Sequence, residues 1–558
     1  MRAVVVVLAA LATCAWLTLE ARIGLVAARM LQIEEYETRR FLVWGRTRAW
    51  LAHPAAQVSV PFAAAGVAGG MAGGQHAALI AAAAWLAAAM AGNVRWRWTD
   101  AKRPLVYTAR MRRLLGAAGI TAAVAAAGAA LLIASGQPLA GSILALVVSA
   151  GAPASAQLLI VAGNAAAAPV ERQVRQHYLQ RARRHLGAVD PLVIAVTGSY
   201  GKTSTKQILA QLLSDDAHVL ATRKSFNTLM GITRVINEDL MPDHRIFIVE
   251  MDAYGPGEIA AMCALVKPRY AILTSVGPQH LERFGSMERI GAALYEAVAS
   301  LPGAGVAVVH TGDEGGTDIA ARALADGRRV VRYGLSDSGA DVVTSDIHID
   351  GRGTRFDWRW TAERLHSAVS LPLLGAHQAL NMSAALAVVH LLGRDVDAAV
   401  TAARTLRPVD HRLQPLQTGG PISVIDDSYN ANPVGVHSAL DVLAAMDGGV
   451  RILVTPGLVE LGSVEEAENR RYGVHAGAVC DHVIVVEARP AAALMAGLRD
   501  SGIAVDRVHL VRSLREATEV ISRIASAGDV VLFANDLPDT YLPGPGARLA
   551  GTAASPGR

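Results

Sequence analysis

The fold of this chain depends on the stretch Thr197-Gly198-Ser199-Tyr200-Gly201-Lys202-Thr203. The apolar, β-branched run 192–196 precedes it and a helical pattern over 202–213 follows, which predicts a strand, a glycine turn and a helix N-terminus in that order. Backbone amides and the helix dipole at such a turn attract phosphate, while Lys202 adds a positive charge and Thr203 a magnesium ligand. The alternative is a tight turn whose lysine is merely solvated.

We favour the phosphate site, because the turn lies directly behind a predicted strand. Its spacing, G-x-x-G-K-T, is shorter than the usual G-x-x-x-x-G-K-T and is typical of a narrower group of proteins. The residues predicted to bind the nucleotide here are Gly198, Ser199, Gly201, Lys202, Thr203 and Ser204.

The composition indicates a membrane region ahead of this turn. Hydrophobic residues make up 52% of the 558 residues, and mean hydropathy is +0.31. Residues 58–93 and 114–170 contain no Lys, Arg, Asp or Glu, and 3–19 is another apolar run. Because a spanning helix takes about 20 residues, we expect a multi-span transmembrane region over 1–170 with about five helices. The first could be a signal peptide, but no small-residue cleavage pattern follows Leu19.

Arginine-rich segments separate the apolar regions, and a basic stretch predicted as a linker helix covers 171–190. Positively charged loops stay in the cytoplasm, so we expect a multi-pass protein of the inner cell membrane with everything after residue 170 in the cytoplasm. The pI of about 9.0 then reflects membrane-surface charge, and no nucleic-acid partner is expected. Three widely spaced cysteines indicate a reduced compartment and no zinc site.

From residue 191 onward, β-branched runs alternate with helical patterns, which predicts α/β domains with mostly parallel sheets. We expect a central ATP-binding domain over 191–408, a small antiparallel insertion at 341–371, a Rossmann-like C-terminal domain over 409–545 and a disordered tail over 546–558. Strands are predicted at 192–197, 246–251, 270–275, 306–310, 329–333, 422–427, 451–456, 482–486 and 529–533.

Two polar residues follow predicted strands of the first sheet. Glu250 ends the apolar run 246–250, and His280 comes shortly after 270–275. Ligands gather at the carboxyl ends of parallel strands, so we expect Glu250 to meet the Mg²⁺ of the nucleotide and His280 to contact metal or phosphate. The alternatives are a solvated strand cap for Glu250 and a structural role for His280.

Several motifs occur in a fixed order after the glycine turn. They are SFNTLMGI at 225–232, VEMDAYGPGEI at 249–259, GPQHLERFGS at 277–286, LLGAHQALN at 373–381, IDDSYNANP at 425–433 and TPGLVELG at 455–462. Together with TGSYGKTSTK they resemble the Mur ligases, most nearly the D-alanyl-D-alanine-adding MurF type, in a subgroup with an N-terminal membrane region. The resemblance covers about 190–545.

The resemblance implies an ATP-dependent amide ligase of cell-wall biosynthesis. A substrate carboxylate takes the γ-phosphoryl group of ATP, and an amine attacks the resulting acyl phosphate; ATP and Mg²⁺ are the implied cofactors. The implied catalytic residues are Lys202, Glu250 and His280, with Thr203 and Glu250 on one Mg²⁺ and His280 on a second.

The resemblance also implies binding roles for other residues. Asn381 would contact adenine, and Arg412 and Asp427 would hold the nucleotide from the C-terminal domain. The residues implied near the substrate are Asn227, Tyr429, Asn430 and Asn432. A simpler interpretation of 428–433 is a turn that caps a helix, with Pro433 in the first turn, and both can hold together.

Two features depart from the family pattern. The family has a lysine, modified to a carbamate, about fourteen residues after the histidine, and here Leu294 stands there. Either Glu296 or water replaces it, or the second metal is weakly held, or activity is reduced. The family's soluble UDP-recognition domain also has no counterpart, and the membrane region stands in its place. A small-molecule or lipid-linked envelope precursor with a carboxylate, plus an amine, are therefore the expected substrates.

Other functions remain open. A membrane amide ligase of the poly-γ-glutamate synthase kind also joins an anchor to a Mur-like domain, although IDDSYNANP favours the MurF type. A nucleotide-binding scaffold with weakened catalysis is the alternative that Leu294 keeps open. A transporter-type ATPase is disfavoured, because the predicted spans carry almost no charge for a substrate path.

Overall fold

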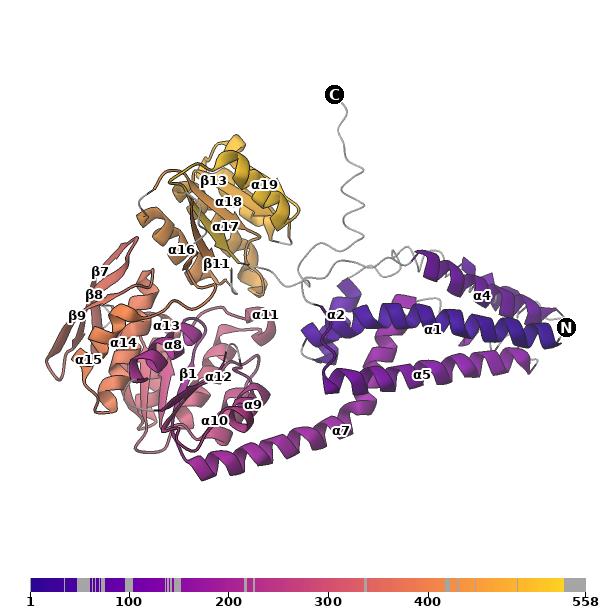
Figure 1. Cartoon of the computed structure of the whole chain (residues 1–558), viewed down its shortest axis with the longest axis horizontal. Coiled ribbons are helices and arrows are strands. Elements are labelled where there is room, and N and C mark those ends of the chain that lie inside the picture. Colours follow the sequence, from indigo (N-terminus) through magenta and orange to yellow (C-terminus); the bar gives the residue numbers. More distant parts are fainter. Residues whose placement is uncertain are drawn as a thin grey trace. The chain divides into compact units, whose positions relative to one another are not determined.

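The structure is a computed structural model (Figure 1). It describes residues 2–34, 36–47, 76–95, 104–135, 152–214, 218–223, 226–335, 339–416, 422–428, 431–446, 448–488 and 490–535, with a few positions between 61 and 71 and between 137 and 144. The chain divides into two compact units, of which the first contains the residues up to Val174 and the second is Arg175–Leu537.

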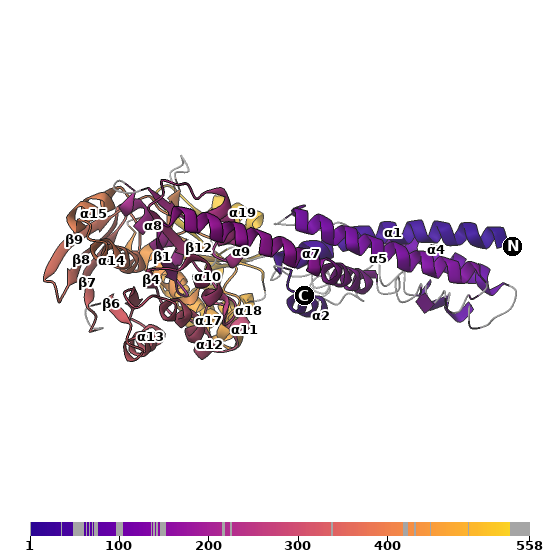
Figure 2. The same ribbon diagram turned by 90° about the horizontal axis from the view of Figure 1, so that it is seen from below.

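The first unit consists of helices. These are α1 (Arg2–Ile33), α2 (Thr38–Thr47), α4 (Ala77–Arg95), α5 (Ala109–Ala134) and the first part of α7 (Ala152–Val189). Helices α1, α4 and α5 lie side by side (Figures 1 and 2) and bury Trp16, Trp85 and Ala126 between them.

Three of the described helices are long and apolar enough to cross a membrane, namely Ala3–Ile33, Ala77–Val94 and Ala109–Ala134. The prediction of about five spans also drew on residues 58–76 and 136–151, most of which lie outside the described residues. The count of five therefore stays a prediction.

The predicted linker helix is not separate from the preceding apolar segment. Residues 171–189 continue α7 without a break, although Pro169 lies inside the helix. Arginine and glutamine, the commonest residues of this segment, are strong helix formers and favour its continuation. Ala182 and Leu186 near its end are buried in the hydrophobic core of the second unit.

In the second unit, the described strands of the first sheet follow the order β2-β3-β1-β4-β5-β6-β7-β8-β9. They are β1 (Leu192–Thr197), β2 (Val219–Ala221), β3 (Ile246–Glu250), β4 (Tyr270–Leu273), β5 (Val306–His310), β6 (Arg329–Leu335), β7 (Val342–Asp350), β8 (Gly353–Trp360) and β9 (Leu365–Leu371). Pairing is parallel from β2 to β7, and β1 lies between β3 and β4.

The antiparallel insertion predicted at 341–371 is confirmed, since β7, β8 and β9 pair antiparallel. It extends the parallel sheet, because β7 also pairs with β6.

Both faces of this sheet are covered by helices (Figure 1). Alternate residues of β1 enter different cores: Val193 and Ala195 face one, and Ile194 and Val196 face the other. The first core contains α9 (Leu229–Glu238), α10 (Glu258–Val266), α11 (Leu281–Phe284), α12 (Met287–Ala299) and α13 (Glu314–Ala325). The second contains α8 (Lys202–Leu213), α14 (Ala376–Leu391) and α15 (Val396–Ala402).

A second sheet follows the order β10-β11-β15-β12-β13-β14 and is parallel except for β10. Its strands are β10 (Gln414–Leu416), β11 (Ser423–Asp427), β12 (Arg451–Thr455), β13 (His482–Val486), β14 (Val508–Val511) and β15 (Val530–Ala534). Helices α16 (Pro433–Ala445), α17 (Glu465–Val479) and α18 (Ala491–Ser501) pack on one face, and α19 (Leu514–Ile524) packs on the other.

Glu296 caps a neighbouring helix. Its carboxylate on α12 accepts hydrogen bonds from the backbone amides of Gly257 (2.5 Å) and Ala260 (2.9 Å) at the start of α10. Gly257, the N-cap residue of α10, has no side chain for this task. Both Glu296 oxygens are engaged in capping, which disfavours the interpretation in which Glu296 replaces the family lysine as a metal ligand.

We expect Glu296→Ala to lower the free energy of unfolding by about 1–2 kcal/mol, because two amides at a helix N-terminus lose their acceptor. Thermal unfolding of the detergent-solubilised chain measures the effect. Asp318→Asn, which neutralises an exposed carboxylate on α13, is the matched control. Equal melting temperatures for Glu296→Ala and the control would contradict the capping role.

Candidate functional site

The glycine turn packs closely against the residue that follows β4 and against helix α14. A Cβ on Gly198, whose φ is +134°, would lie 2.1 Å from the Thr274 hydroxyl oxygen after β4. A Cβ on Gly201, whose φ is +81°, would lie 2.5 Å from Asn381 Oδ1 on α14. Glycine is therefore required at both positions for conformation and for space.

Helix α8 begins at Lys202, directly after Gly201. Gly201 has no side chain that accepts a hydrogen bond from the first amides of the helix. The N-terminus of a helix carries a partial positive charge and amide donors that point outward. The start of α8 is thus suited to an anion such as phosphate.

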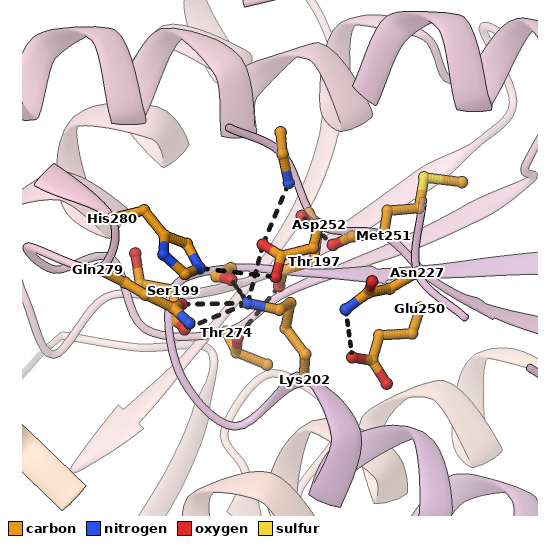
Figure 3. A network of polar contacts seen from close by, with 12 residues as sticks. Thr197, Ser199, Lys202, Asn227, Glu250, Met251, Asp252, Thr274, Gln279 and His280 are labelled. Carbon is orange, nitrogen blue, oxygen red and sulfur yellow. Dashed lines mark hydrogen bonds and ion pairs between the residues drawn. The ribbon is translucent and has the colours of Figure 1, made fainter. Parts of the chain in front are cut away.

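Lys202 is buried at the centre of the turn (Figure 3). Its ammonium group donates to the carbonyl oxygens of Gly198 (2.7 Å) and Ser199 (3.2 Å) and to Gln279 Oε1 (3.2 Å). It also lies 3.3 Å from Asp252 Oδ1. The lysine is therefore held by oxygen atoms from the turn itself and from the loops after β3 and β4.

Glu250, at the end of β3, lies beside Thr203. Its Oε1 accepts from the Thr203 hydroxyl (3.0 Å) and from Asn227 Nδ2 (3.2 Å), the latter drawn in Figure 3. Its Oε2 pairs with the Lys206 ammonium at 2.8 Å, and both side chains are buried. Hydroxyl and carboxylate oxygens are ligands that Mg²⁺ accepts, so Thr203 and Glu250 fit a nucleotide-bound Mg²⁺.

His280 follows β4 and has a left-handed backbone with φ of 54°. Its Nδ1 lies 2.6 Å from Glu460 Oε2, and its Nε2 lies 4.0 Å from Asp252 Oδ2. The ring of Tyr254 packs edge-on against the imidazole. His280 therefore lies between two carboxylates, of which Glu460 comes from the segment after β12.

The residues around His280 do not fit the second Mg²⁺ that the resemblance implies. Leu294 is only 7% exposed and belongs to the core under the sheet. Glu296 is engaged at the start of α10. Within the described ranges, no three or more His, Cys, Asp and Glu side chains form a group that would hold a metal ion.

Asn381 packs against the first turn of α8. Its Oδ1 accepts from the Thr205 hydroxyl (3.1 Å), and its Nδ2 donates to Gln378 Oε1 (3.1 Å). Ser204 is buried in the same turn. The structure thus brings Asn381 to the glycine turn together with Lys202, Thr203 and Glu250.

Asp427 stands at the carboxyl end of β11 in the second sheet, and the charge of Arg412 acts on it. Asp427 ends β11 and accepts from the Leu413 amide at 3.1 Å. Burial raises the pKa of Asp427 to about 7, although the Arg412 charge opposes the rise. Burial and the same Arg412 charge lower the pKa of His377, on α14, to about 4. The Arg412 charge therefore acts on both side chains.

Asn432 is the N-cap of α16, where its Oδ1 accepts from the Gly435 amide at 2.7 Å and Pro433 begins the helix. The helix-capping interpretation of this segment is confirmed. Tyr429 and Asn430 lie outside the described residues.

Sequence reasoning missed four residues of this network. They are Lys206, Asp252, Gln279 and Glu460. Lys206 lies one helical turn after Lys202, a spacing that places both on one face of α8 and could have found it. The others stand inside quoted motifs, but only the fold shows which side chains they meet.

Comparisons with known proteins agree with this arrangement. Residues 196–389 match the Mur ligase middle domain, and residues 411–535 match the Mur ligase, glutamate ligase domain. The chain is 32% identical over 295 residues to UDP-N-acetylmuramoyl-tripeptide--D-alanyl-D-alanine ligase of Escherichia coli (strain K12), covering 53% of this chain and 64% of that enzyme. It thus spans slightly less than two thirds of that relative's length.

A Bacillus subtilis (strain 168) enzyme of the same name is 28% identical and covers 63% of this chain, which spans 75% of its length. Among solved structures, MurF from Acinetobacter baumannii matches with a TM-score of 0.58 and 27% identity, covering 65% of this chain and 77% of that one. MurF ligase from Thermotoga maritima in complex with ADP matches with a TM-score of 0.57 and 28% identity, covering 65% and 80%.

The two matched domains together cover more than half of the sequence, and they contain the glycine turn, Glu250, His280 and Asp427. The chain therefore belongs to the Mur ligase family.

Proposed function

We propose that this protein is a membrane-anchored, MurF-like ligase of cell-envelope assembly that forms an amide bond with ATP. The observation that carries the proposal is the glycine turn with Lys202 at its centre and the Thr203–Glu250 pair beside it. The MurF relatives support the reaction class.

The reaction has two steps. A substrate carboxylate oxygen attacks the γ-phosphorus of ATP and releases ADP, and the amine nitrogen then attacks the acyl carbon and releases phosphate. Phosphoryl transfer needs positioning and neutralisation of charge more than covalent help. A Mg²⁺ held by Thr203 and Glu250 would supply part of that neutralisation.

The other residues of the site are proposed to bind the nucleotide and the substrate and to orient Glu250. In the proposal, Lys202 and the α8 amides bind phosphate oxygens, Lys206 and Asn227 hold Glu250 in place, and Asn381 contacts adenine. In the proposal, Arg412 and Asp427 bind the nucleotide from the C-terminal domain. Asn227 and Asn432, with Tyr429 and Asn430, are proposed near the substrate.

The carboxylate substrate is proposed to be an envelope precursor at the inner face of the membrane, either free or lipid-linked. Three apolar helices long enough to span support the anchor. A nucleotide-binding scaffold with weakened catalysis is a second candidate, because Leu294 is packed in the core where the family lysine is expected.

Incubation with ATP, D-alanyl-D-alanine and a UDP-muramoyl tripeptide tests the proposal. We expect phosphate release coupled to a ligated product, and we expect Lys202→Ala to reduce both by about 100-fold or more. Lys267→Asn is the matched control, since it removes an exposed lysine at a left-handed position that asparagine tolerates. Phosphate release without product would exclude this substrate pair, whereas neither phosphate nor product would favour the scaffold.

We expect Leu294→Lys to lower the melting temperature without raising ATP turnover, because an ammonium group buried in the core pays desolvation and meets apolar side chains. Thermal unfolding and phosphate release measure the two effects, with Leu294→Met as the volume-conserving control. A large gain in turnover would show instead that the variant restores a lost metal ligand.

Asp427 makes stability depend on pH. Because its folded pKa is about 7 and its ordinary value is near ~4, the unfolded chain releases a proton that the folded chain keeps. The contribution of Asp427 to stability therefore falls as pH rises from about 4 to about 7. We expect the free energy of unfolding of Asp427→Asn, relative to that of wild type, to rise by roughly 2–3 kcal/mol from pH 5 to pH 8.

Unfolding of both chains at the two pH values measures this gain. Asp506→Asn, which changes an exposed carboxylate, is the control. A difference between Asp427→Asn and wild type that is equal at pH 5 and pH 8 would contradict the assignment.

A further inference from the structure

The segment after β12 reaches from the C-terminal domain to the turn that carries His280. Glu460 Oε2 lies 2.6 Å from His280 Nδ1, and Glu460 Oε1 accepts from Arg283 Nη2 at 3.1 Å. The Glu460 carbonyl oxygen also accepts from the Glu282 amide at 3.3 Å. One residue of the C-terminal domain thus makes three polar contacts with consecutive parts of the middle domain.

His280 and Glu460 both have a left-handed backbone conformation, which is unfavourable for residues with a side chain. The φ angles are 54° at His280 and 66° at Glu460, in the left-handed region that side chains other than Gly and Asn rarely adopt. Each such residue costs on the order of 1 kcal/mol. Conformations of this cost persist where the surrounding structure fixes them, and they concentrate at functional sites.

The segment that carries Glu460 is held by hydrogen bonds to two asparagine side chains. Asn469, which is fully buried, accepts from the Leu458 amide (2.8 Å) and donates to the Leu458 carbonyl (2.9 Å). Asn535 Nδ2 donates to the Gly457 carbonyl at 2.6 Å. The backbone just before Glu460, at Gly457 and Leu458, is therefore held in place by two asparagine side chains of the C-terminal domain.

On its other side, His280 faces the glycine turn. Its Nε2 lies 4.0 Å from Asp252 Oδ2, and Asp252 Oδ1 lies 3.3 Å from the Lys202 ammonium (Figure 3). Lys202, Asp252, His280, Glu460 and Arg283 thus form a line of neighbouring polar side chains. This line joins the phosphate end of the site to the C-terminal domain.

The same imidazole lacks the partner that the family resemblance implies. Leu294 is apolar and packed in the core, and the Glu296 carboxylate caps α10. The ligand set for a second cation is therefore incomplete within the middle domain. The group that contacts the imidazole at hydrogen-bonding distance is Glu460 instead.

We propose that Glu460 is a positioning residue for His280, so that the C-terminal domain orients the imidazole toward Asp252 and Lys202. In the family, a metal-bound lysine is expected to take this part instead. The proposal rests on the proposed ligase function. The Glu460 carboxylate holds Nδ1, so that Nε2 is the ring nitrogen that points at the phosphate end of the site. Residues that orient a functional histidine by a hydrogen bond to its other ring nitrogen change activity by about 10–100-fold when removed.

Steady-state kinetics of the full chain in detergent tests this role. We expect Glu460→Ala and Glu460→Gly to lower kcat by about 10–100-fold while KM for ATP changes less than about 2-fold. Both variants remove the carboxylate, but only glycine relieves the left-handed backbone, so Glu460→Gly is expected to be the more stable. Glu466→Gln, an exposed acid in the first turn of α17, is the matched control.

A role in folding alone predicts a different pattern. The loss of kcat would then follow the melting temperature, and Glu460→Gly would be more active than Glu460→Ala. That result, or a kcat within about 2-fold of wild type in both variants, would overturn the proposal.

A second measurement separates this inference from the proposed ligase function. Melting temperatures of His280→Asn, Glu460→Gln and the double variant, with ADP and Mg²⁺ present, form a double-mutant cycle. Asparagine tolerates the left-handed backbone at 280. We expect the double variant to lose no more than the larger single loss, even if no amide product is found. Additive losses would show that the two side chains do not interact and would overturn the proposal.

Discussion

The glycine turn between β1 and α8 forms only because two positions lack side chains. Gly198 approaches Thr274 after β4, and Gly201 approaches Asn381 on α14. These contacts place the N-terminus of α8 at the carboxyl edge of the sheet, where β3 and β4 end on either side of β1. Glu250 and the turn that carries His280 therefore meet the phosphate end of the site because of where this turn lies.

The buried pair of Glu250 and Lys206 is better explained by orientation than by stability. Removing two charges from water costs about as much as their attraction returns, so such pairs contribute little net stability. The pair does, however, fix one carboxylate oxygen and leave the other beside the Thr203 hydroxyl and the Asn227 amide. A carboxylate that is already oriented needs little rearrangement when a cation and a phosphate arrive.

Much of the fold could be predicted because its strongest signals are local. The strand at 192–197 and the helix at 202–213 match residue for residue, since a short apolar run, a glycine turn and a helical pattern each determine nearby backbone. The parallel α/β architecture and the Mur-type domains are also confirmed. Strands β2, β10 and β14 were missed because three or four residues become a strand only through their pairing partners.

The unpredicted part of the site depends on long-range contacts. Lys206 and Glu250 are separated by 44 residues, and His280 and Glu460 by 180. Motifs showed that these segments carry chemistry, but not which side chains would meet. The distinction matters for His280. A metal-held imidazole is positioned whenever the cation is bound, whereas an imidazole held by Glu460 is positioned only while the C-terminal domain is docked on the middle domain. Docking of the C-terminal domain would then complete the phosphate end of the site. With Leu294 in place of the family lysine, the middle domain alone lacks the group that would position His280.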